Sequence, residues 1–233
     1  MLSMMPTELI DNISAVTRRI RAAEGAAGRP KNSVSLLAVS KTKPAELIRI
    51  AYQNGQVAFG ENYAQEMEEK AQLLADLPIE WHFIGPLQSN KTAAIAKYCS
   101  WAHSVDRFKI ARRLSEQRSP DKHPLNVLIQ INVSRERSKS GVLPEALPDL
   151  AQQVDALPGI SLRGLMAIPA PASSAEDPRA PFKAMRELKD SLGFDRPDFD
   201  ILSMGMSADL EAAVAEGANL VRVGTDIFGA RYN

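Results

Sequence analysis

The sequence predicts a single α/β barrel in which eight parallel strands alternate with helices. Short apolar runs recur along the whole chain, helical segments separate them, and no boundary of a second domain interrupts the series. The length of 233 residues lies within the usual size of such a barrel. We therefore expect residues 1–233 to form one (β/α)8 domain.

The expected strands are apolar runs without alternation, which is typical of strands buried on both faces. They lie near residues 34–39, 57–59, 81–84, 101–104, 127–133, 162–167, 201–204 and 220–223. Helical patterns lie between them, near residues 45–54, 61–76, 88–98, 106–117, 144–156, 181–191 and 208–217. Two polar loops, 134–141 and 169–181, follow strands, and we expect the proline-rich second loop to be mobile.

A further helix is expected before the first strand. Thr7 is its expected N-cap, apolar residues from Leu9 to Ile20 recur at helical spacing, and the stretch GAAGRP at 25–30 ends it. The segment TDIFGARYN, after the last strand, is too short for a full helix. We therefore expect the N-terminal helix to occupy the position of the eighth barrel helix.

Composition narrows the classes of function. Lys plus Arg and Asp plus Glu balance at 28 each, which gives no electrostatic footprint for nucleic acid or an anionic membrane. Cys99 is the only cysteine, so no intrachain disulfide is expected, in keeping with a reducing compartment. The start has no signal-peptide pattern, and the longest apolar runs have the length of strands. We expect a cytoplasmic protein without a membrane span.

The carboxyl ends of the strands form the functional face of such a barrel. The first strand, in LLAVSKTKP, runs into Lys41. A partly desolvated lysine has a lowered pKa, and its neutral amine can form an imine with an aldehyde. A lysine at a strand end is also commonly a surface charge, and Lys43, just before Pro44, is expected to be such a structural lysine.

The last two strands run into SMGMS and VRVGT. Ser207 is an expected N-cap, Gly205 lets the backbone approach a ligand, and Gly224 and Thr225 form a second small turn. Barrels commonly bind phosphate in the loops after strands seven and eight. Serine and glycine are also ordinary turn residues, but two such loops in these places favour a phosphate site.

Arg222 lies inside the last strand between apolar neighbours. Its side chain is either outward and paired, or inward among ligand atoms. A guanidinium only donates hydrogen bonds, so beside a pyridine nitrogen it would keep that nitrogen unprotonated. Together, Lys41, a phosphate loop and Arg222 match the aldehyde, phosphate and ring nitrogen of pyridoxal 5′-phosphate. Asn62, in FGENY, either bonds a ring substituent or caps a helix.

Other polar residues give weaker signals. Asp209 and Glu211 suit the start of a helix, but they would weaken anion binding if they faced the phosphate loop. His82, His103 and His123 show no metal-ligand spacing, so no metal site is expected. His82 lies in an apolar run and is expected to be a hydrogen-bonded histidine of the core.

Six long motifs between residues 36 and 231 resemble the YggS/PLPBP family of pyridoxal phosphate homeostasis proteins. They are LLAVSKTKP, FGENYAQE, WHFIGPLQSNK, VLIQINVSRERSKSG, GLMAIP and LSMGMSADLEAAVAEGANLVRVGTDIFGAR. That family is similar to the barrel domain of alanine racemase and of bacterial-type ornithine decarboxylase, the fold-type III group.

The resemblance implies a cofactor-binding site for pyridoxal phosphate. It implies that Lys41 forms the internal aldimine, that Arg222 faces the pyridine nitrogen, and that Asn62 lies near the ring. The phosphate is then expected around Ser207, Gly224 and Thr225, with Met204, Gly205 and Met206 beside it.

Catalysis is not expected to be the main role. The related racemases use a second, β-rich domain and a tyrosine from a partner subunit, whereas this chain ends at Asn233 and is expected to lack that domain. Tyr63 and His82 are conceivable second bases, but nothing in the sequence places them opposite Lys41. An arginine at the ring nitrogen also makes the ring a weaker electron sink. We assign no catalytic residue.

The leading interpretation is therefore a pyridoxal phosphate-binding protein in vitamin B6 and amino-acid homeostasis. It would be a monomer that holds the cofactor as a lysine aldimine, with apo-enzymes as conceivable recipients. The alternatives are a small pyridoxal phosphate-dependent amino-acid racemase and, more remotely, a Schiff-base aldolase with a substrate phosphate site.

Overall fold

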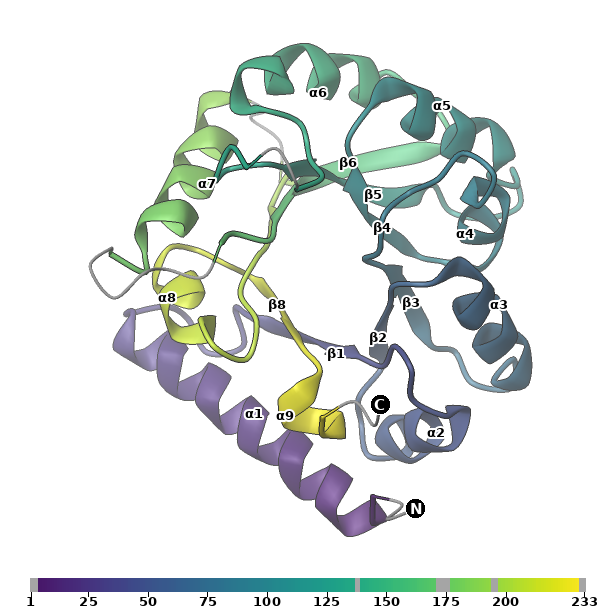
Figure 1. Cartoon of the computed structure of the whole chain (residues 1–233), viewed down its shortest axis with the longest axis vertical. Helices are drawn as coiled ribbons and strands as arrows, with labels where there is room; N and C mark the ends of the chain where they lie inside the picture. The colour runs from purple at the N-terminus through teal and green to yellow at the C-terminus, as the bar shows by residue number, and fades with distance from the viewer. Residues whose placement is uncertain (1–3, 137–138, 171–176, 194–196, 231–233) are drawn as a thin grey trace.

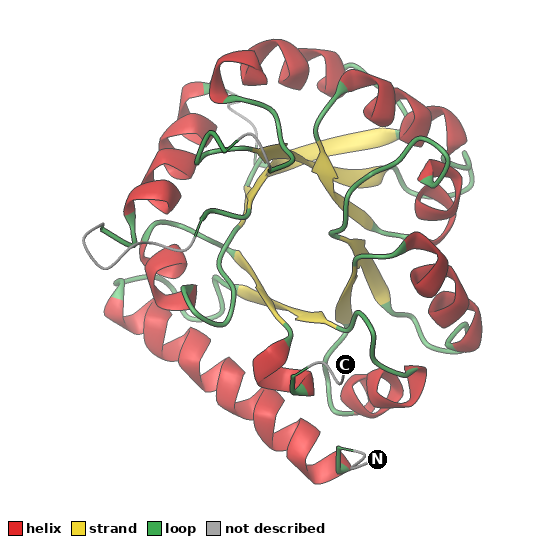
Figure 2. Cartoon of the chain, in the orientation of Figure 1, coloured by secondary structure: helices red, strands yellow, loops and turns green. Residues whose placement is uncertain are grey.

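The computed structural model describes residues 4–136, 139–170, 177–193 and 197–230. Eight parallel strands form a closed barrel in sequence order, as predicted (Figures 1 and 2). The strands are β1 (Ser35–Val39), β2 (Ala58–Glu61), β3 (Glu80–Phe83), β4 (Trp101–Val105), β5 (Leu125–Ile131), β6 (Ile160–Ala167), β7 (Ile201–Ser203) and β8 (Leu220–Val223). Each overlaps one of the predicted apolar runs. Residues 137–138 and 171–176 of the two polar loops lie outside the described residues.

Helices surround the barrel in the predicted places (Figure 1). They are α1 (Pro6–Ala26), α2 (Ala45–Gln53), α3 (Ala64–Leu73), α4 (Thr92–Tyr98), α5 (Phe108–Gln117), a 3₁₀ turn η1 (Pro144–Ala146), α6 (Leu147–Asp155), α7 (Ala180–Ser191), α8 (Leu210–Ala215) and α9 (Thr225–Phe228). Several begin later than predicted, because the loops at the carboxyl ends of the strands are longer than the apolar pattern indicates.

The N-terminal helix α1 occupies the position of the eighth barrel helix. It packs against α2, α8 and α9 outside the seam between β1 and β8 (Figure 1). The prediction that Thr7 is its N-cap is wrong: Met5 is the N-cap and Pro6 is the first helical residue. Proline suits this position because its φ is fixed near the helical value and it has no N–H to satisfy. The helix ends at Ala26, before Gly28, whose φ is +64°.

Barrel closure pairs the two ends of the chain. β1 and β8 lie side by side with Leu37 opposite Arg222. The main apolar core fills the layer between strands and helices, with fully buried residues such as Phe59 and Ile110. Polar groups are buried as well, including the side chains of His103 and Arg222. The barrel interior therefore holds polar side chains as well as apolar ones.

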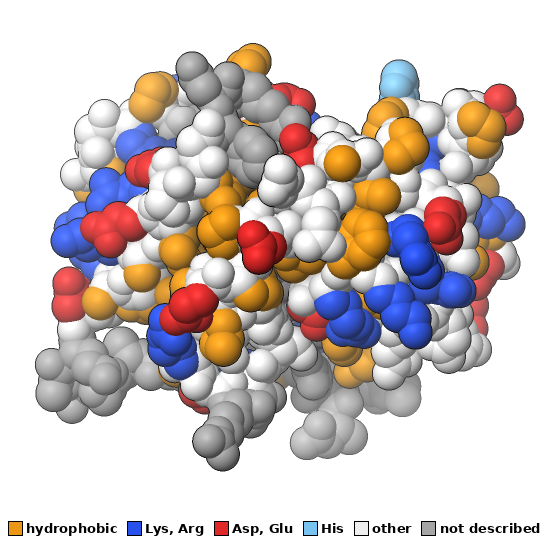
Figure 3. Space-filling view, turned by 90° about the horizontal axis from the view of Figure 1, so that it is seen from above, with side chains coloured by type: hydrophobic (Ala, Val, Ile, Leu, Met, Phe, Trp, Pro, Cys, Tyr) orange, Lys and Arg blue, Asp and Glu red, His pale blue; other side chains and the backbone are white. Residues whose placement is uncertain are grey.

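The surface is of mixed charge. Figure 3 shows one side of the molecule, on which acidic and basic side chains occur together around apolar ones. Within the described ranges, no helix combines the length and the apolar character needed to cross a membrane.

We predict that Gly164→Ala lowers the free energy of unfolding by more than about 3 kcal/mol, because it blocks close strand pairing. Gly164 has a φ of +149°, and a Cβ there would overlap the carbonyl oxygen of Ile201 on the neighbouring strand β7. Urea unfolding measures the effect. The control is Gly25→Ala in α1, where a Cβ meets nothing within 4 Å and roughly 0.5–1 kcal/mol of added stability is expected. Equal effects of the two changes would contradict this account.

Candidate functional site

A cavity of about 330 Å³ opens at the carboxyl ends of β1, β2, β7 and β8. Its volume falls within the range of small-molecule sites. Seven of the nine predicted site residues line it: Lys41, Asn62, Met206, Ser207, Arg222, Gly224 and Thr225. Ile84 and Ile168 add apolar side chains to the lining. The fold thus brings together residues that lie up to 184 positions apart (Lys41 to Thr225).

The other two predicted residues, Met204 and Gly205, do not belong to this lining. Met204 is fully buried in the apolar core. Gly205 has a φ of +92°, and a Cβ would come within 2.6 Å of the Cβ of Ala213. The carbonyl oxygen of Gly205 accepts a hydrogen bond from the backbone N–H of Arg222 at 3.0 Å. These two residues shape the loop behind the cavity.

Lys41 sits in a tight turn that follows β1. The backbone N–H of Lys43 donates to the carbonyl oxygen of Ser40 at 3.1 Å, which closes the turn. Thr42 has a φ of +65°, in the left-handed region that costs a residue with a Cβ about 1 kcal/mol or more. Its backbone N–H donates to a carboxylate oxygen of Glu66 at 2.5 Å. This strained turn places Lys41, which is partly buried, in the wall of the cavity.

A buried ionic cluster of Lys70, Glu61 and Glu66 supports that turn. The Lys70 ammonium donates to the carbonyl oxygen of Ser40 at 2.8 Å and to carboxylates of Glu61 and Glu66 at 2.7 Å each. Ser40 Oγ donates to the same Glu61 oxygen at 2.6 Å. Burial raises the pKa of Glu61, while Lys70 and Ser40 oppose this shift. Sequence reasoning missed this cluster; the only local signal was Glu66 and Lys70 at helical i,i+4 spacing.

Lys43 has a different role from that of Lys41. The sequence predicts a structural lysine here, and Lys43 also lines the cavity. Its ammonium donates to the carbonyl oxygens of Phe228, Gly229 and Ala230 at 2.8, 3.2 and 3.1 Å. A cation is favoured at these carbonyls because they belong to the last residue of α9 and the two residues after it. Burial lowers the pKa of Lys43.

Arg222 points into the barrel, which decides between the two orientations left open by the sequence. Only 4% of the residue is exposed, and its guanidinium donates to Ser203 Oγ at 2.7 Å and to the carbonyl oxygen of Ala167 at 2.8 Å. Both acceptors are neutral. Burial lowers the pKa of Arg222 to about 10, so the group stays charged at neutral pH. The cavity therefore has a buried cation in its wall.

Asn62 presents an acceptor to the same cavity. Its Oδ1 atom is buried and has no hydrogen-bond partner among the residues that the structure describes. A buried amide oxygen without a donor is costly by about 1–3 kcal/mol. A ligand with a hydroxyl or N–H group would satisfy this atom, so Asn62 is a candidate binding residue.

The loop after β7 is organised by Asp209 and not by Ser207. The prediction that Ser207 is an N-cap is wrong, since α8 begins at Leu210 and Asp209 is its N-cap. Residues 206–209 instead form a turn in which the Met206 N–H donates to Asp209 Oδ1 at 2.6 Å. Ser207 remains in the lining of the cavity. The Asp209 carboxylate is thereby engaged with its own turn.

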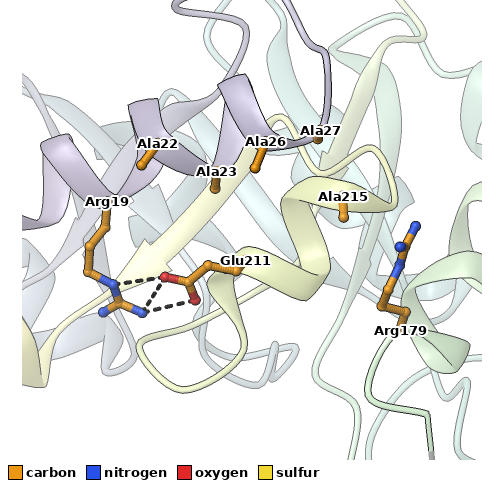
Figure 4. Close-up of a pocket in the computed structure, with 8 residues that line it drawn as sticks. All are labelled: Arg19, Ala22, Ala23, Ala26, Ala27, Arg179, Glu211 and Ala215. Carbon is orange, nitrogen blue, oxygen red and sulfur yellow. Dashed lines mark hydrogen bonds and ion pairs between the residues drawn. The ribbon is translucent and has the colours of Figure 1, made fainter.

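Arg19 of α1 braces the loops next to the cavity. It donates to the carboxylate of Glu211 at 3.0 Å, to that of Asp226 at 2.8 Å and to the carbonyl oxygen of Ser207 at 3.0 Å. Figure 4 shows Arg19 reaching from α1 to Glu211 on α8, in a separate hollow of about 440 Å³. The two carboxylates are thus paired with a cation, which lessens their repulsion of an anion in the cavity.

Neither conceivable second base lies in the cavity lining. Tyr63 is about half exposed, at 52%, and precedes α3. His82 is buried in β3, where it bonds His103 at 2.8 Å, as expected for a histidine of the core. Across the described part of the chain, no group of three or more His, Cys, Asp or Glu residues is arranged to hold a metal ion.

We predict that Lys70→Met lowers the free energy of unfolding by about 3 kcal/mol, because it leaves the buried Glu61 carboxylate without its cationic partner. Removing Lys70 also lets burial raise the pKa of Glu61 further above its unfolded value. Stability is then retained at low pH and lost as pH rises through that folded pKa, so the deficit should grow between about pH 5 and about pH 8.

Urea unfolding at both pH values measures this deficit. Lys109→Met, at an exposed position of α5, is the control and should change stability little at either pH. A deficit that shrinks with rising pH would contradict the role assigned to the Lys70–Glu61 pair.

Comparison with known proteins confirms the resemblance inferred from the motifs. Residues 12–232 match the family of the alanine racemase N-terminal domain. The pyridoxal phosphate homeostasis protein of Pseudomonas aeruginosa is 56% identical over 223 residues, covering 96% of each chain. PipY of Synechococcus elongatus PCC7942, solved with PLP bound, has a TM-score of 0.80 at 35% identity, covering 95% of this chain and 100% of that one.

Alanine racemase from Corynebacterium glutamicum shares the fold, with a TM-score of 0.69 at 17% identity; the match covers 98% of this chain and 63% of the racemase. At that identity the likeness concerns the barrel alone. The chain thus belongs to the family of pyridoxal phosphate homeostasis proteins, built on the barrel of the alanine racemase N-terminal domain.

Proposed function

We propose that the cavity binds pyridoxal 5′-phosphate and that the protein takes part in the homeostasis of this cofactor. The observation that carries the proposal is the convergence of Lys41, Arg222 and the loops bearing Ser207 and Thr225 in one cavity. An amine, a fixed cation and hydroxyl groups are the partners that the aldehyde, the ring nitrogen and the phosphate require. The name of the Pseudomonas aeruginosa relative and the PLP bound to PipY support it.

In this proposal Lys41 holds the cofactor through an imine bond to its aldehyde carbon. Glu66 and Lys70 fix the backbone on both sides of this lysine, so little backbone freedom is lost when the bond forms. Lys43 is engaged with three carbonyl oxygens and therefore is not the reacting amine.

The other groups of the cofactor are assigned by their chemistry. Arg222 donates to the ring nitrogen, and the buried Oδ1 of Asn62 accepts from the ring hydroxyl. The phosphate lies against the hydroxyls of Ser207 and Thr225. Gly224 lets this turn pack closely on β1, because a Cβ at Gly224 would come within 3.2 Å of the carbonyl oxygen of Val39.

We propose that the protein holds and releases the cofactor, with turnover playing no main part. An arginine at the ring nitrogen keeps that nitrogen an acceptor, which weakens the ring as a sink for carbanion electrons. Neither Tyr63 nor His82 lines the cavity as a second base. All the groups named come from one chain, so we propose that the protein binds the cofactor as a monomer. We also propose that it acts in the cytoplasm and supplies the cofactor to apo-enzymes. Sedimentation of the loaded protein tests the monomer, and activation of an apo-enzyme tests the transfer.

We predict that the purified protein, given pyridoxal phosphate, shows a visible absorption band from an imine. Borohydride reduction followed by mass spectrometry should place the modification on Lys41 and not on Lys43. Lys41→Ala should lose the covalent band and bind the cofactor at least about tenfold more weakly, the equivalent of about 1.4 kcal/mol. A wild-type protein that takes up no pyridoxal phosphate, or that is modified on Lys43, would overturn the assignment.

A second prediction distinguishes a protein that only holds the cofactor from an enzyme that uses it for catalysis. Incubation of the loaded protein with alanine in deuterated water should exchange the α-proton no faster than free pyridoxal phosphate at the same concentration. The reason is that neither Tyr63 nor His82 lines the cavity as a second base, and the Lys43 amine is held by three carbonyl oxygens. Proton NMR of the α-position measures the rate. Inversion with deuterium incorporation at a catalytic rate would favour the racemase alternative.

A further inference from the structure

A continuous chain of side-chain hydrogen bonds crosses the barrel interior and ends at Arg222. The Arg222 guanidinium donates to Ser203 Oγ at 2.7 Å, and Ser203 Oγ lies 3.0 Å from His103 Nδ1. His103 Nε2 lies 2.8 Å from His82 Nδ1, and His82 Nε2 lies 3.2 Å from Glu80 Oε1. The chain therefore links β8, β7, β4 and β3, and no residue in it besides Arg222 lines the proposed cofactor cavity.

The middle of the chain is shielded from solvent, whereas its far end is not. Ser203 and His103 are fully buried and His82 is 2% exposed. The ring of His82 also stacks on Trp101 at an interplanar angle of 4°. Glu80, whose side chain is 42% exposed, lines a different cavity of about 380 Å³ at the amino-terminal ends of the strands. The chain thus connects the two ends of the barrel.

The protonation states in the chain follow from the charge of Glu80 at its far end and from the burial of the two histidines. Hydrogen bonds from His82 and Trp101 lower the pKa of Glu80, so it is a carboxylate at neutral pH and only accepts. Burial lowers the pKa of His82 and, further, that of His103, so both rings are neutral and each carries one N–H.

These states fix the direction of every bond. His82 must donate to Glu80 from Nε2, so its Nδ1 accepts the N–H of His103 Nε2. His103 Nδ1 is then bare and accepts the hydroxyl hydrogen of Ser203. The Ser203 oxygen is left with its lone pairs for the Arg222 guanidinium. Each donor in the chain has one acceptor, and all bonds point from the arginine toward Glu80.

We propose that Glu80, His82, His103 and Ser203 are positioning residues for the Arg222 guanidinium. A serine hydroxyl alone is a rotor, so its lone pairs are not fixed toward the guanidinium. Because His103 accepts the hydroxyl hydrogen, the lone pairs of the Ser203 oxygen stay directed at Arg222. Glu80, four hydrogen bonds away, thereby sets the orientation of the cation in the cofactor cavity. The identity of the ligand at that cation rests on the proposed function; the chain itself does not.

The first experiment uses the cofactor-free protein. NMR of protein labelled with ¹⁵N in its histidines should show His82 and His103 both protonated at Nε2 and bare at Nδ1 at neutral pH, with the exposed His123 as reference. Glu80→Gln removes the charge and should alter the signals of His103, which does not touch residue 80. Glu46→Gln, an exposed carboxylate in α2, should leave them unchanged.

The second experiment uses protein loaded with pyridoxal phosphate. Ser203→Ala should shift the visible band of the bound cofactor and weaken binding about tenfold, because Arg222 loses its oriented acceptor. Ser203→Thr keeps the hydroxyl and should restore both. Thermal unfolding checks that each variant is folded, and Glu80→Gln should shift the band in the same sense as Ser203→Ala.

Three outcomes would overturn the proposal. One is a wild-type His82 or His103 that is charged or protonated at Nδ1. Another is a Glu80→Gln variant whose histidine signals match those of Glu46→Gln. The third is a Ser203→Ala variant that binds the cofactor with the wild-type band and affinity. If wild-type protein binds no pyridoxal phosphate, the proposed function fails, and the histidine measurements still decide whether the chain has the assigned direction.

Discussion

The closure of the barrel between β1 and β8 is the constraint on which the candidate site depends. It sets Leu37 opposite Arg222 and brings the turn of Lys41 next to the loops that follow β7 and β8. The carboxyl ends of all strands in a parallel barrel lie on the same rim. Closure therefore places residues that are far apart in the sequence side by side in the lining of the cavity. Helix α1 covers this seam, and Arg19 joins it to the loop at Ser207 and to both C-terminal helices.

Buried charges are the second feature of this barrel, and they stand in two different situations. Lys70 and Glu61 neutralise each other next to the Lys41 turn. Because the cost of desolvation offsets much of their attraction, the pair contributes to the position of the turn more than to the free energy of unfolding. Arg222 instead has two neutral acceptors. Arg222 also lines the cavity, so the orientation of its guanidinium decides which acceptor groups of a ligand it would reach.

The strands and the order of the helices could be predicted from the sequence, because apolar runs and helical spacing are local signals. The N-caps expected at Thr7 and Ser207 could not be predicted. Helix α1 begins earlier, at Pro6, and α8 begins later, because Met206 and Asp209 form a hydrogen-bonded turn before it. The direction of Arg222 was also undecided, because in a strand buried on both faces the alternation of side chains carries no polarity pattern.

The interactions that sequence reasoning missed are those between elements. Lys70 is one of several charged residues on a helix, and only the fold shows that it meets the carbonyl oxygen of Ser40, thirty positions earlier. The polar chain from Glu80 to Arg222 joins four strands, and each member alone resembles an ordinary buried polar residue. Such networks are specified by strand register, which single-residue patterns do not encode.

If the cavity holds pyridoxal phosphate as proposed, the same geometry explains why this barrel would suit holding the cofactor. The braced backbone turn carries Lys41 to the cavity, and Arg222 would keep the ring nitrogen an acceptor. Both features would favour a stable adduct over an activated one, because they stabilise the ground state without adding a second base. The proposed hydrogen-bonded chain would act in the same direction, because a guanidinium with an oriented acceptor has little freedom to follow charge that develops during a reaction.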